Sequence, residues 1–242
     1  MSGEAKRELV VRDVQSLVSA STGVAAGRMP VVARLMYDAS ASIRDNKPSL
    51  VEPLKGAATE FEIGLASNER NLLSRALFHR TVIEIDRRSF LEPSLWRASP
   101  MANFYVANGD RTSLDVVYYS EIKPLCERFE AQPDGVFHLL MVFTDGRNNG
   151  EDLAAKVRAR MAHVVDLANT RCDGVLRTRI MVAYIGIGLS REEHLRNCTV
   201  RYGIPEQWFK WYPAGEDEVC KMGEEMSQSV SEFSDGNETR FW

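Results

Sequence analysis

Residues 31–42 read Val31-Val32-Ala33-Arg34-Leu35-Met36-Tyr37 and then Asp38-Ala39-Ser40-Ala41-Ser42. The first part is short, apolar and begins with β-branched residues, which predicts a buried strand over about residues 31–38. The second part places one carboxylate and two hydroxyls where that strand ends. In open α/β sheets, ligands bind in the crevice outside the carboxyl ends of the strands. An all-oxygen cluster suits Mg²⁺, Mn²⁺ or Ca²⁺ better than zinc, so the stretch predicts both a sheet and a candidate metal site.

Beyond residue 42 the chain alternates between helix-like and strand-like segments. Apolar residues at helical spacing predict helices over residues 49–65, from near 112, and over 152–168, 192–198 and 216–233. Apolar and β-branched runs predict strands over residues 76–85, 104–106, 137–143, 179–187 and 208–212. Such alternation predicts an α/β fold, with a doubly wound, mostly parallel sheet flanked by helices, as in Rossmann-like proteins.

Composition narrows the class of protein. The 242 residues are 44% hydrophobic and 26% charged, which is ordinary for a globular protein. A net charge of −4 does not favour nucleic-acid binding, and no apolar run reaches the roughly 20 residues that a membrane span needs. The first residues lead into no apolar core of a secretory signal, so we expect a cytoplasmic protein. The four cysteines are far apart and are interpreted as free thiols, and His138, inside an apolar run, as a hydrogen-bonded histidine on a strand.

Two further oxygen ligands fall at comparable positions. Thr112 follows Asn108-Gly109-Asp110-Arg111 at the predicted start of a helix, and Asp145 follows the apolar run 137–143. In a doubly wound sheet these positions share one edge with the Asp38 motif. Two carboxylates and three hydroxyls can then converge on one divalent cation.

The combination resembles the metal-ion-dependent adhesion site of von Willebrand factor A domains. The resemblance rests on Asp38-x-Ser40-x-Ser42, Thr112 and Thr144-Asp145-Gly146, in that order, and on the strand-helix alternation from about residue 30 to 233. This chain has Ala41 where family members often have Gly, and Gly109 stands three residues before the threonine. The stretch Arg28-Met29-Pro30-Val31-Val32 also resembles bacterial cytosolic members, including those associated with tellurite resistance.

The resemblance implies a function and a ligand set. The metal ligands would be Asp38, Ser40, Ser42, Thr112 and Asp145, holding Mg²⁺, with Mn²⁺ or Ca²⁺ as alternatives. The last coordination position would be taken by an exposed Asp or Glu of another protein. The chain would then be a protein-interaction module, not an enzyme, without nucleic-acid or membrane partners. Its organisation would be an N-terminal extension over residues 1–29, the domain over 30–233 and a polar tail over 234–242.

Other interpretations of the same residues remain open. Asp38-x-Ser-x-Ser alone can cap a following helix, and Thr112 can be a helix N-cap. A metal-dependent phosphoester hydrolase is an alternative function, although the chain lacks a phosphate-binding Gly-x-x-x-x-Gly-Lys-Ser/Thr loop. A scaffold with a structural metal site is another. Gly186-Ile187-Gly188 lacks the third glycine of a dinucleotide fingerprint and is interpreted as a tight exit turn.

Overall fold

The computed structural model describes residues 29–45, 49–132, 135–149, 152–169, 179–188, 190–213 and 216–234. Residues 1–28 of the predicted extension, most of the polar tail and Cys172 lie outside the described residues. The division into an extension, a domain and a tail therefore stays a prediction.

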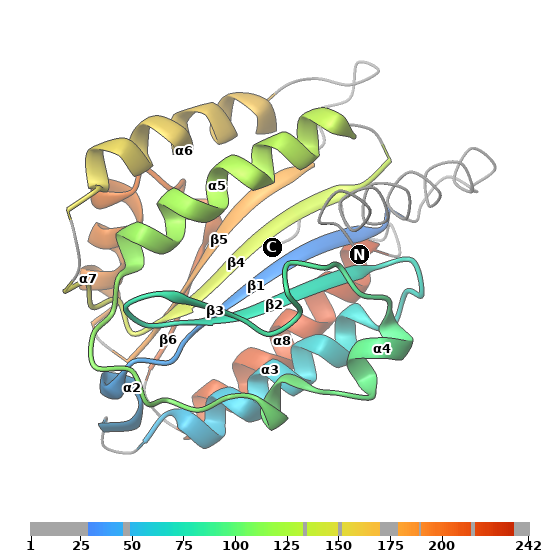
Figure 1. Ribbon diagram of the computed structural model, residues 1–242, viewed down its shortest axis with the longest axis horizontal. Helices are drawn as coiled ribbons and strands as arrows, with labels where there is room; N and C mark the ends of the chain where they lie inside the picture. The colour runs from blue at the N-terminus through green and yellow to red at the C-terminus, as the bar shows by residue number, and fades with distance from the viewer. Residues whose placement is uncertain are drawn as a thin grey trace, which may run out of the picture.

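A six-stranded sheet forms the centre of the molecule, in the order β3-β2-β1-β4-β5-β6 (Figure 1). Five strands are parallel, and β3 alone pairs in the antiparallel sense. The bounds are β1 Val31–Asp38, β2 Leu72–Phe78, β3 Val82–Glu84, β4 Phe137–Thr144, β5 Ile180–Ile187 and β6 Phe209–Tyr212. All residues of β1, β4 and β5 are buried, which explains why their sequences are nearly continuous apolar runs.

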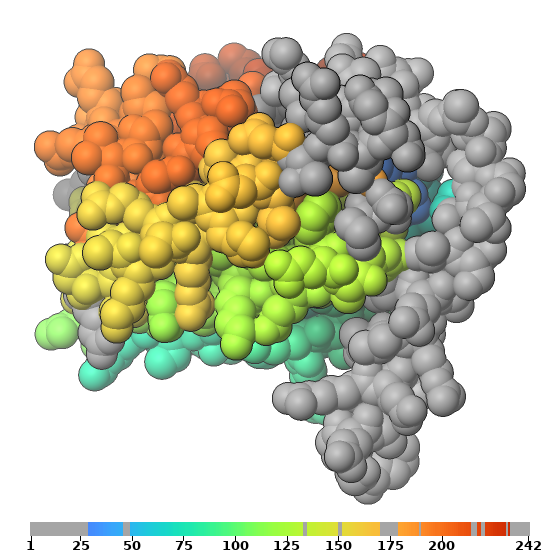
Figure 2. Space-filling view, turned by 90° about the horizontal axis from the view of Figure 1, so that it is seen from above, coloured from blue at the N-terminus to red at the C-terminus, as the bar shows by residue number. Residues whose placement is uncertain are grey.

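Helices cover both faces of this sheet, as the predicted doubly wound α/β fold requires (Figure 1). α5 (Leu114–Ala131) and α6 (Ala154–Ala168) lie side by side on one face, which Figure 2 shows from outside. α3 (Val51–Leu65) and α8 (Glu216–Ser234) pack together on the other. Three short helices occupy connections: α2 (Ala41–Asp45), α4 (Pro93–Arg97) and α7 (Arg191–Leu195).

Three predicted elements differ from the structure. The strand predicted over residues 76–85 is two strands, because the chain reverses at residues 79–81 and β3 returns along β2. The strand predicted over 104–106 is wrong: those residues follow a 3₁₀ turn at Met101–Asn103 and belong to no strand. The short helix predicted over 192–198 is α7, continued by a π-helical turn at Arg196–Arg201.

Two buried arginines occupy neighbouring strands and point to opposite faces of the sheet. Arg34 on β1 binds Glu121 of α5 at 3.2 Å, Ser74 at 2.9 Å and Glu84 at 2.8 Å. Arg75 on β2 binds Asp86 at 2.9 Å and Glu62 of α3 at 3.2 Å. Buried charges need partners of this kind, because an isolated charge is costly to remove from water.

Other expectations concern single residues and helices. His138 lies on β4, and its Nε2 is 3.0 Å from the carbonyl oxygen of Gln132. Cys126 and Cys198 are buried free thiols, as predicted. β5 ends at Ile187, and Gly188 has φ +89°, which confirms an exit turn there. Within the described residues, no helix combines the length and apolar character needed to cross a membrane.

Candidate metal-binding site

The Asp38 motif lies at the carboxyl end of β1, at the centre of the sheet. Asp38 is the last residue of β1, and its Oδ1 accepts a hydrogen bond from the Ser40 amide at 3.0 Å. The Ala39 amide donates to the Phe78 carbonyl at 2.7 Å, which fixes the turn against the end of β2. The Asp38 carboxylate is thus used in this turn, directly before the five-residue α2.

The two serine hydroxyls of the motif are adjacent. Their Oγ atoms are 2.9 Å apart. Ser40 is buried, with 1% of its surface exposed, while Ser42 is half-buried. The pair therefore presents two neutral oxygen ligands at the same place, one of them accessible from outside.

The second carboxylate follows β4, the strand next to β1. The Thr144 hydroxyl donates to Asp38 Oδ2 at 2.9 Å and accepts from the Gly146 amide at 3.0 Å. Asp145 Oδ1 accepts from the Arg147 amide at 3.1 Å. Asp145 Oδ2 is buried and has no hydrogen-bond partner among the described residues, although Arg147 Nε lies 3.8 Å away. A buried carboxylate oxygen without a hydrogen bond is unfavourable, so this atom is open to a further ligand.

The segment that carries Thr112 is fixed beside the Asp38 motif. Gly109 pairs with Ser40 in a parallel bridge, with the Gly109 amide donating to the Ala39 carbonyl at 3.0 Å. The Asn149 amide donates to the Thr112 carbonyl at 2.8 Å. Thr112 is 1% exposed, and its hydroxyl forms no hydrogen bond with the other candidate ligands in the described part of the chain. Ser113, not Thr112, is the residue at the N-terminal boundary of α5, so the N-cap interpretation of Thr112 is wrong.

Electrostatics at this edge reflect two buried carboxylates. Burial raises the pKa of Asp38 to about 7, the negative charge of Asp145 acts in the same direction, and hydrogen bonds from Ser40 and Thr144 partly oppose them. Burial and the Asp38 charge also raise the pKa of Tyr105 well above its ordinary value. The edge of the sheet therefore favours a positive charge near the carboxylates.

The sequence does not reveal how three residues support the site, although two of them, Thr144 and Gly146, belong to the quoted motif. The Tyr105 hydroxyl donates to the Asp38 carbonyl, from a segment wrongly predicted to be a strand. Gly146 has φ +79°, and a Cβ there would lie 2.8 Å from the His194 ring, so glycine is required at this turn. Thr144 is part of the quoted motif, but only the structure shows its bonds to Asp38 and Gly146.

Asp115 connects the Thr112 segment to the next two elements. Its carboxylate, fully buried, accepts from Arg201 Nη2 at 2.8 Å, the Tyr202 hydroxyl at 2.7 Å and the Leu153 amide at 2.8 Å. These bonds join the first turn of α5 to the start of α6 and to the π-helical turn. An acidic residue in the first turn of a helix is common, so the sequence alone does not distinguish this role.

The donor set fits a hard divalent cation. No group of three or more His, Cys, Asp or Glu side chains in the described residues is arranged to hold a metal. A cation at this edge would therefore depend on two carboxylates supplemented by hydroxyls, a composition suited to Mg²⁺, Mn²⁺ or Ca²⁺. The unpartnered Asp145 Oδ2 and the paired Ser40 and Ser42 hydroxyls supply such oxygens.

Comparison with solved structures finds several proteins with a similar fold. The chain resembles a von Willebrand factor type A protein from Catenulispora acidiphila, with 14% identity, a TM-score of 0.58, and 86% of this chain and 47% of the other covered. It also resembles proximal thread matrix protein 1 from the mussel byssus, whose metal-ion-dependent adhesion site holds zinc, with 14% identity, a TM-score of 0.58, and coverage of 86% and 48%. An aerotolerance-related membrane protein from Bacteroides fragilis is similar at 16% identity and a TM-score of 0.53, with coverage of 84% and 99%.

These likenesses show that the chain has a von Willebrand factor A-type fold. The chain spans less than half the length of the first two structures. No protein-family model matches the sequence, and no curated protein does.

Proposed function

We propose that this chain is a Mg²⁺-dependent protein-interaction module that binds a carboxylate of its partner. The observation that carries the proposal is the buried Asp145 Oδ2, which lacks a hydrogen bond beside a second buried carboxylate and two paired hydroxyls. The zinc-occupied adhesion site of the mussel protein supports a divalent cation at this edge of the fold. The bacterial cytosolic setting suggested by residues 28–32 stays a prediction.

Each candidate ligand has a distinct part in the proposal. Asp38 and Asp145 would supply negative charge, while Ser40, Ser42 and Thr112 would supply neutral oxygens. Neutral hydroxyls leave residual positive charge on a bound Mg²⁺, and an Asp or Glu side chain is a strong ligand for such an ion. Thr144 and Tyr105 would hold the Asp38 end of β1 in place, through the hydrogen bonds described above.

Metal binding by the isolated chain is the first test. Titration calorimetry of the full chain, freed of metal with EDTA, should detect one site for Mg²⁺ or Mn²⁺. Asp145→Asn should weaken it by about 100-fold or more, since loss of an outer partner alone costs about 10–100-fold. Glu127→Gln removes an exposed carboxylate whose ion-pair partner among the described residues is Lys123, at 3.5 Å, and it should leave the affinity for the metal unchanged. Equal affinity in all three proteins would refute a metal site at Asp145.

Partner capture is the second test. Pull-downs from a native cell extract, run in parallel with Mg²⁺ and with EDTA, should retain a partner only in Mg²⁺. Capture should fail for Asp145→Asn and persist for Glu127→Gln. A partner retained equally in EDTA and by Asp145→Asn would contradict metal bridging, even if the first test finds a bound ion.

A further inference from the structure

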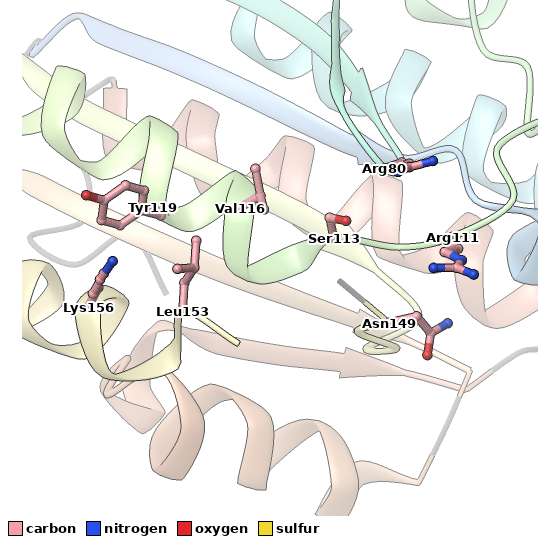
Figure 3. A pocket seen from close by; sticks show the side chains of 8 residues that line it. All are labelled: Arg80, Arg111, Ser113, Val116, Tyr119, Asn149, Leu153 and Lys156. Carbon is pink, nitrogen blue, oxygen red and sulfur yellow. The ribbon is translucent and has the colours of Figure 1, made fainter. Parts of the chain in front are cut away.

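A cavity of about 760 Å³ opens beside the Thr112 segment, between the start of α5, the start of α6 and the β2–β3 turn (Figure 3). This volume lies within the range of about 300–1,000 Å³ that is typical of ligand-binding clefts. The cavity is lined by Arg80, Arg111, Ser113, Val116, Tyr119, Asn149, Leu153 and Lys156. None of these residues is among the candidate metal ligands.

The cavity adjoins the candidate metal site through the backbone. Arg111 and Ser113 are the two chain neighbours of Thr112, and both line it. The Asn149 amide donates to the Thr112 carbonyl at 2.8 Å. The Ser113 amide donates to the carbonyl of His79, the residue before Arg80, also at 2.8 Å. The cavity therefore lies against the segment that carries Thr112, next to the candidate metal site.

The cavity is basic in a protein whose net charge is −4. Its charged lining residues in the described part of the chain are Arg80, Arg111 and Lys156, and all three are exposed. None of the three forms an ion pair with a described carboxylate, although Asp110 adjoins Arg111 in the chain.

Several exposed arginines elsewhere pair with carboxylates, whereas Arg87, Arg158 and Arg196 do not within the described residues. Arg44 pairs with Asp45 at 2.8 Å, Arg88 with Glu84 at 2.9 Å, and the arginines Arg97 and Arg191 pair with Glu69 and Glu206, each at 3.4 Å. Arg80 and Arg111 differ from these in that both line one cavity, with no carboxylate partner for either among the described residues, which favours an anion from outside at that place. Guanidinium groups bind carboxylate and phosphate through two parallel hydrogen bonds, which suits this role.

The two ends of the cavity differ in chemistry (Figure 3). Arg80, Arg111, Ser113 and Asn149 lie at one end, near the Thr112 segment. Val116, Tyr119, Leu153 and Lys156 lie at the other, where Lys156 Nζ is 6.0 Å from the centre of the Tyr119 ring. A ligand that combines an oxyanion with an apolar group matches this division.

We propose that the cavity binds the part of the partner next to its metal-bound carboxylate, with a second oxyanion held by Arg80 and Arg111. An apolar side chain of the same segment would contact Val116 and Leu153. The oxyanion is a carboxylate or a phosphate, from an acidic or a phosphorylated side chain. This inference rests on the proposed function for the metal-bound carboxylate, whereas the anion subsite itself requires no metal.

The subsite is tested without metal and without the natural partner. Phenyl phosphate and benzoate, each an oxyanion joined to an apolar ring, are titrated into the full chain in EDTA while amide NMR signals are followed. We expect saturable shifts at Ser113 and Asn149. Arg80→Gln/Arg111→Gln should weaken binding by about 10-fold or more, as expected when charge-assisted hydrogen bonds are lost. Tighter binding of phenyl phosphate indicates a phosphorylated source, and tighter binding of benzoate an acidic one.

Matched variants separate this subsite from the metal site. Arg97→Gln/Lys123→Gln removes the same charge from exposed positions that do not line the cavity, and should bind both probes like the unmodified chain. Asp145→Asn should also bind them unchanged, so failure of metal binding and failure of the subsite are distinguishable. Shifts that never saturate, or that persist in Arg80→Gln/Arg111→Gln, would overturn the subsite.

The assignment to the partner needs one further measurement. The measurement uses the partner protein that is captured in Mg²⁺. Arg80→Gln/Arg111→Gln should lower the affinity of this chain for that partner by about 10-fold, while Arg97→Gln/Lys123→Gln should leave it unchanged. If the two double variants bind the partner with equal affinity, the assignment of the cavity to the partner is overturned.

Discussion

At the scale of single residues, two buried tyrosines near the end of β1 differ in whether their hydroxyls are paired. Tyr105 donates to the Asp38 carbonyl, whereas the Tyr37 hydroxyl is buried with no hydrogen-bond partner in the described structure. The rings lie in contact, with centroids 6.5 Å apart and planes at 81°. They share one environment, so they form a matched pair for measuring what the hydrogen bond contributes.

Replacing each tyrosine by phenylalanine should therefore have different effects. Tyr105→Phe leaves the Asp38 carbonyl without its donor and should lower the free energy of unfolding by about 1–3 kcal/mol. Tyr37→Phe removes a hydroxyl that is already unpaired, so its effect should lie within about 0.5 kcal/mol or be stabilising. Urea denaturation of the full chains measures both. Equal losses would show that the bond to Asp38 contributes nothing specific.

At the scale of elements, α3 and α8 approach closely because of glycines. A Cβ on Gly64 of α3 would lie 2.6 Å from Ser227 Cα, and one on Gly223 of α8 would lie 2.7 Å from Ala57 Cα. The obstructing atoms are backbone, so the helices would have to separate. Gly56, also on α3, is exposed, and a Cβ there would meet nothing within 4 Å.

Two alanine substitutions in α3 should accordingly have opposite signs. Gly64→Ala should destabilise the protein by about 1–3 kcal/mol, the usual cost of overpacking. Gly56→Ala should stabilise it by about 0.5–1 kcal/mol, since alanine is the better helix former. Thermal and urea unfolding of the two variants measure both changes in the free energy of unfolding. Destabilisation by both, to the same extent, would mean that helix packing at Gly64 is not the cause.

At the scale of the whole molecule, the sequence predicts the strands that are buried along their whole length. β1, β4 and β5 are apolar runs buried throughout, and their bounds fall close to those expected. The β2–β3 reversal was missed because residues 79–81, His-Arg-Thr, contain none of the usual turn residues. Residues 104–106 look strand-like, yet Phe104 and Val106 are 37% and 56% exposed, so no sheet packing supports a strand.

For the candidate site, the sequence predicts the positions of two candidate ligands but not the contacts that support them. The positions of Asp38 and Asp145 follow from the strands that precede them, because adjacent parallel strands end at one edge. The support from Tyr105 and the Asp115 connection depend on distant segments meeting, which spacing does not encode. The same applies to the cavity, whose basic residues come from three separate segments.

Buried histidines give the whole molecule a predictable response to acid. Burial lowers the pKa of His138 to about 4, the nearby positive charge of Arg128 acts in the same direction, and the hydrogen bond to Gln132 partly opposes them. In the unfolded chain the pKa of histidine is about 6.5. Between these values the unfolded state binds more protons, so stability is complete above about pH 6.5 and is lost as pH falls toward 4.

Comparison with His138→Phe isolates this contribution. Burial also lowers the pKa of His194 to about 4, which acts in the same direction, and raises that of Glu62 to about 7, which has the opposite effect. Both groups remain in the variant, so the difference between the two proteins reports His138 alone. From pH 7.5 to pH 5 the unmodified chain should lose about 2 kcal/mol more than the variant, at 1.36 kcal/mol per pKa unit. Parallel stability curves over this range would show that His138 has no lowered pKa.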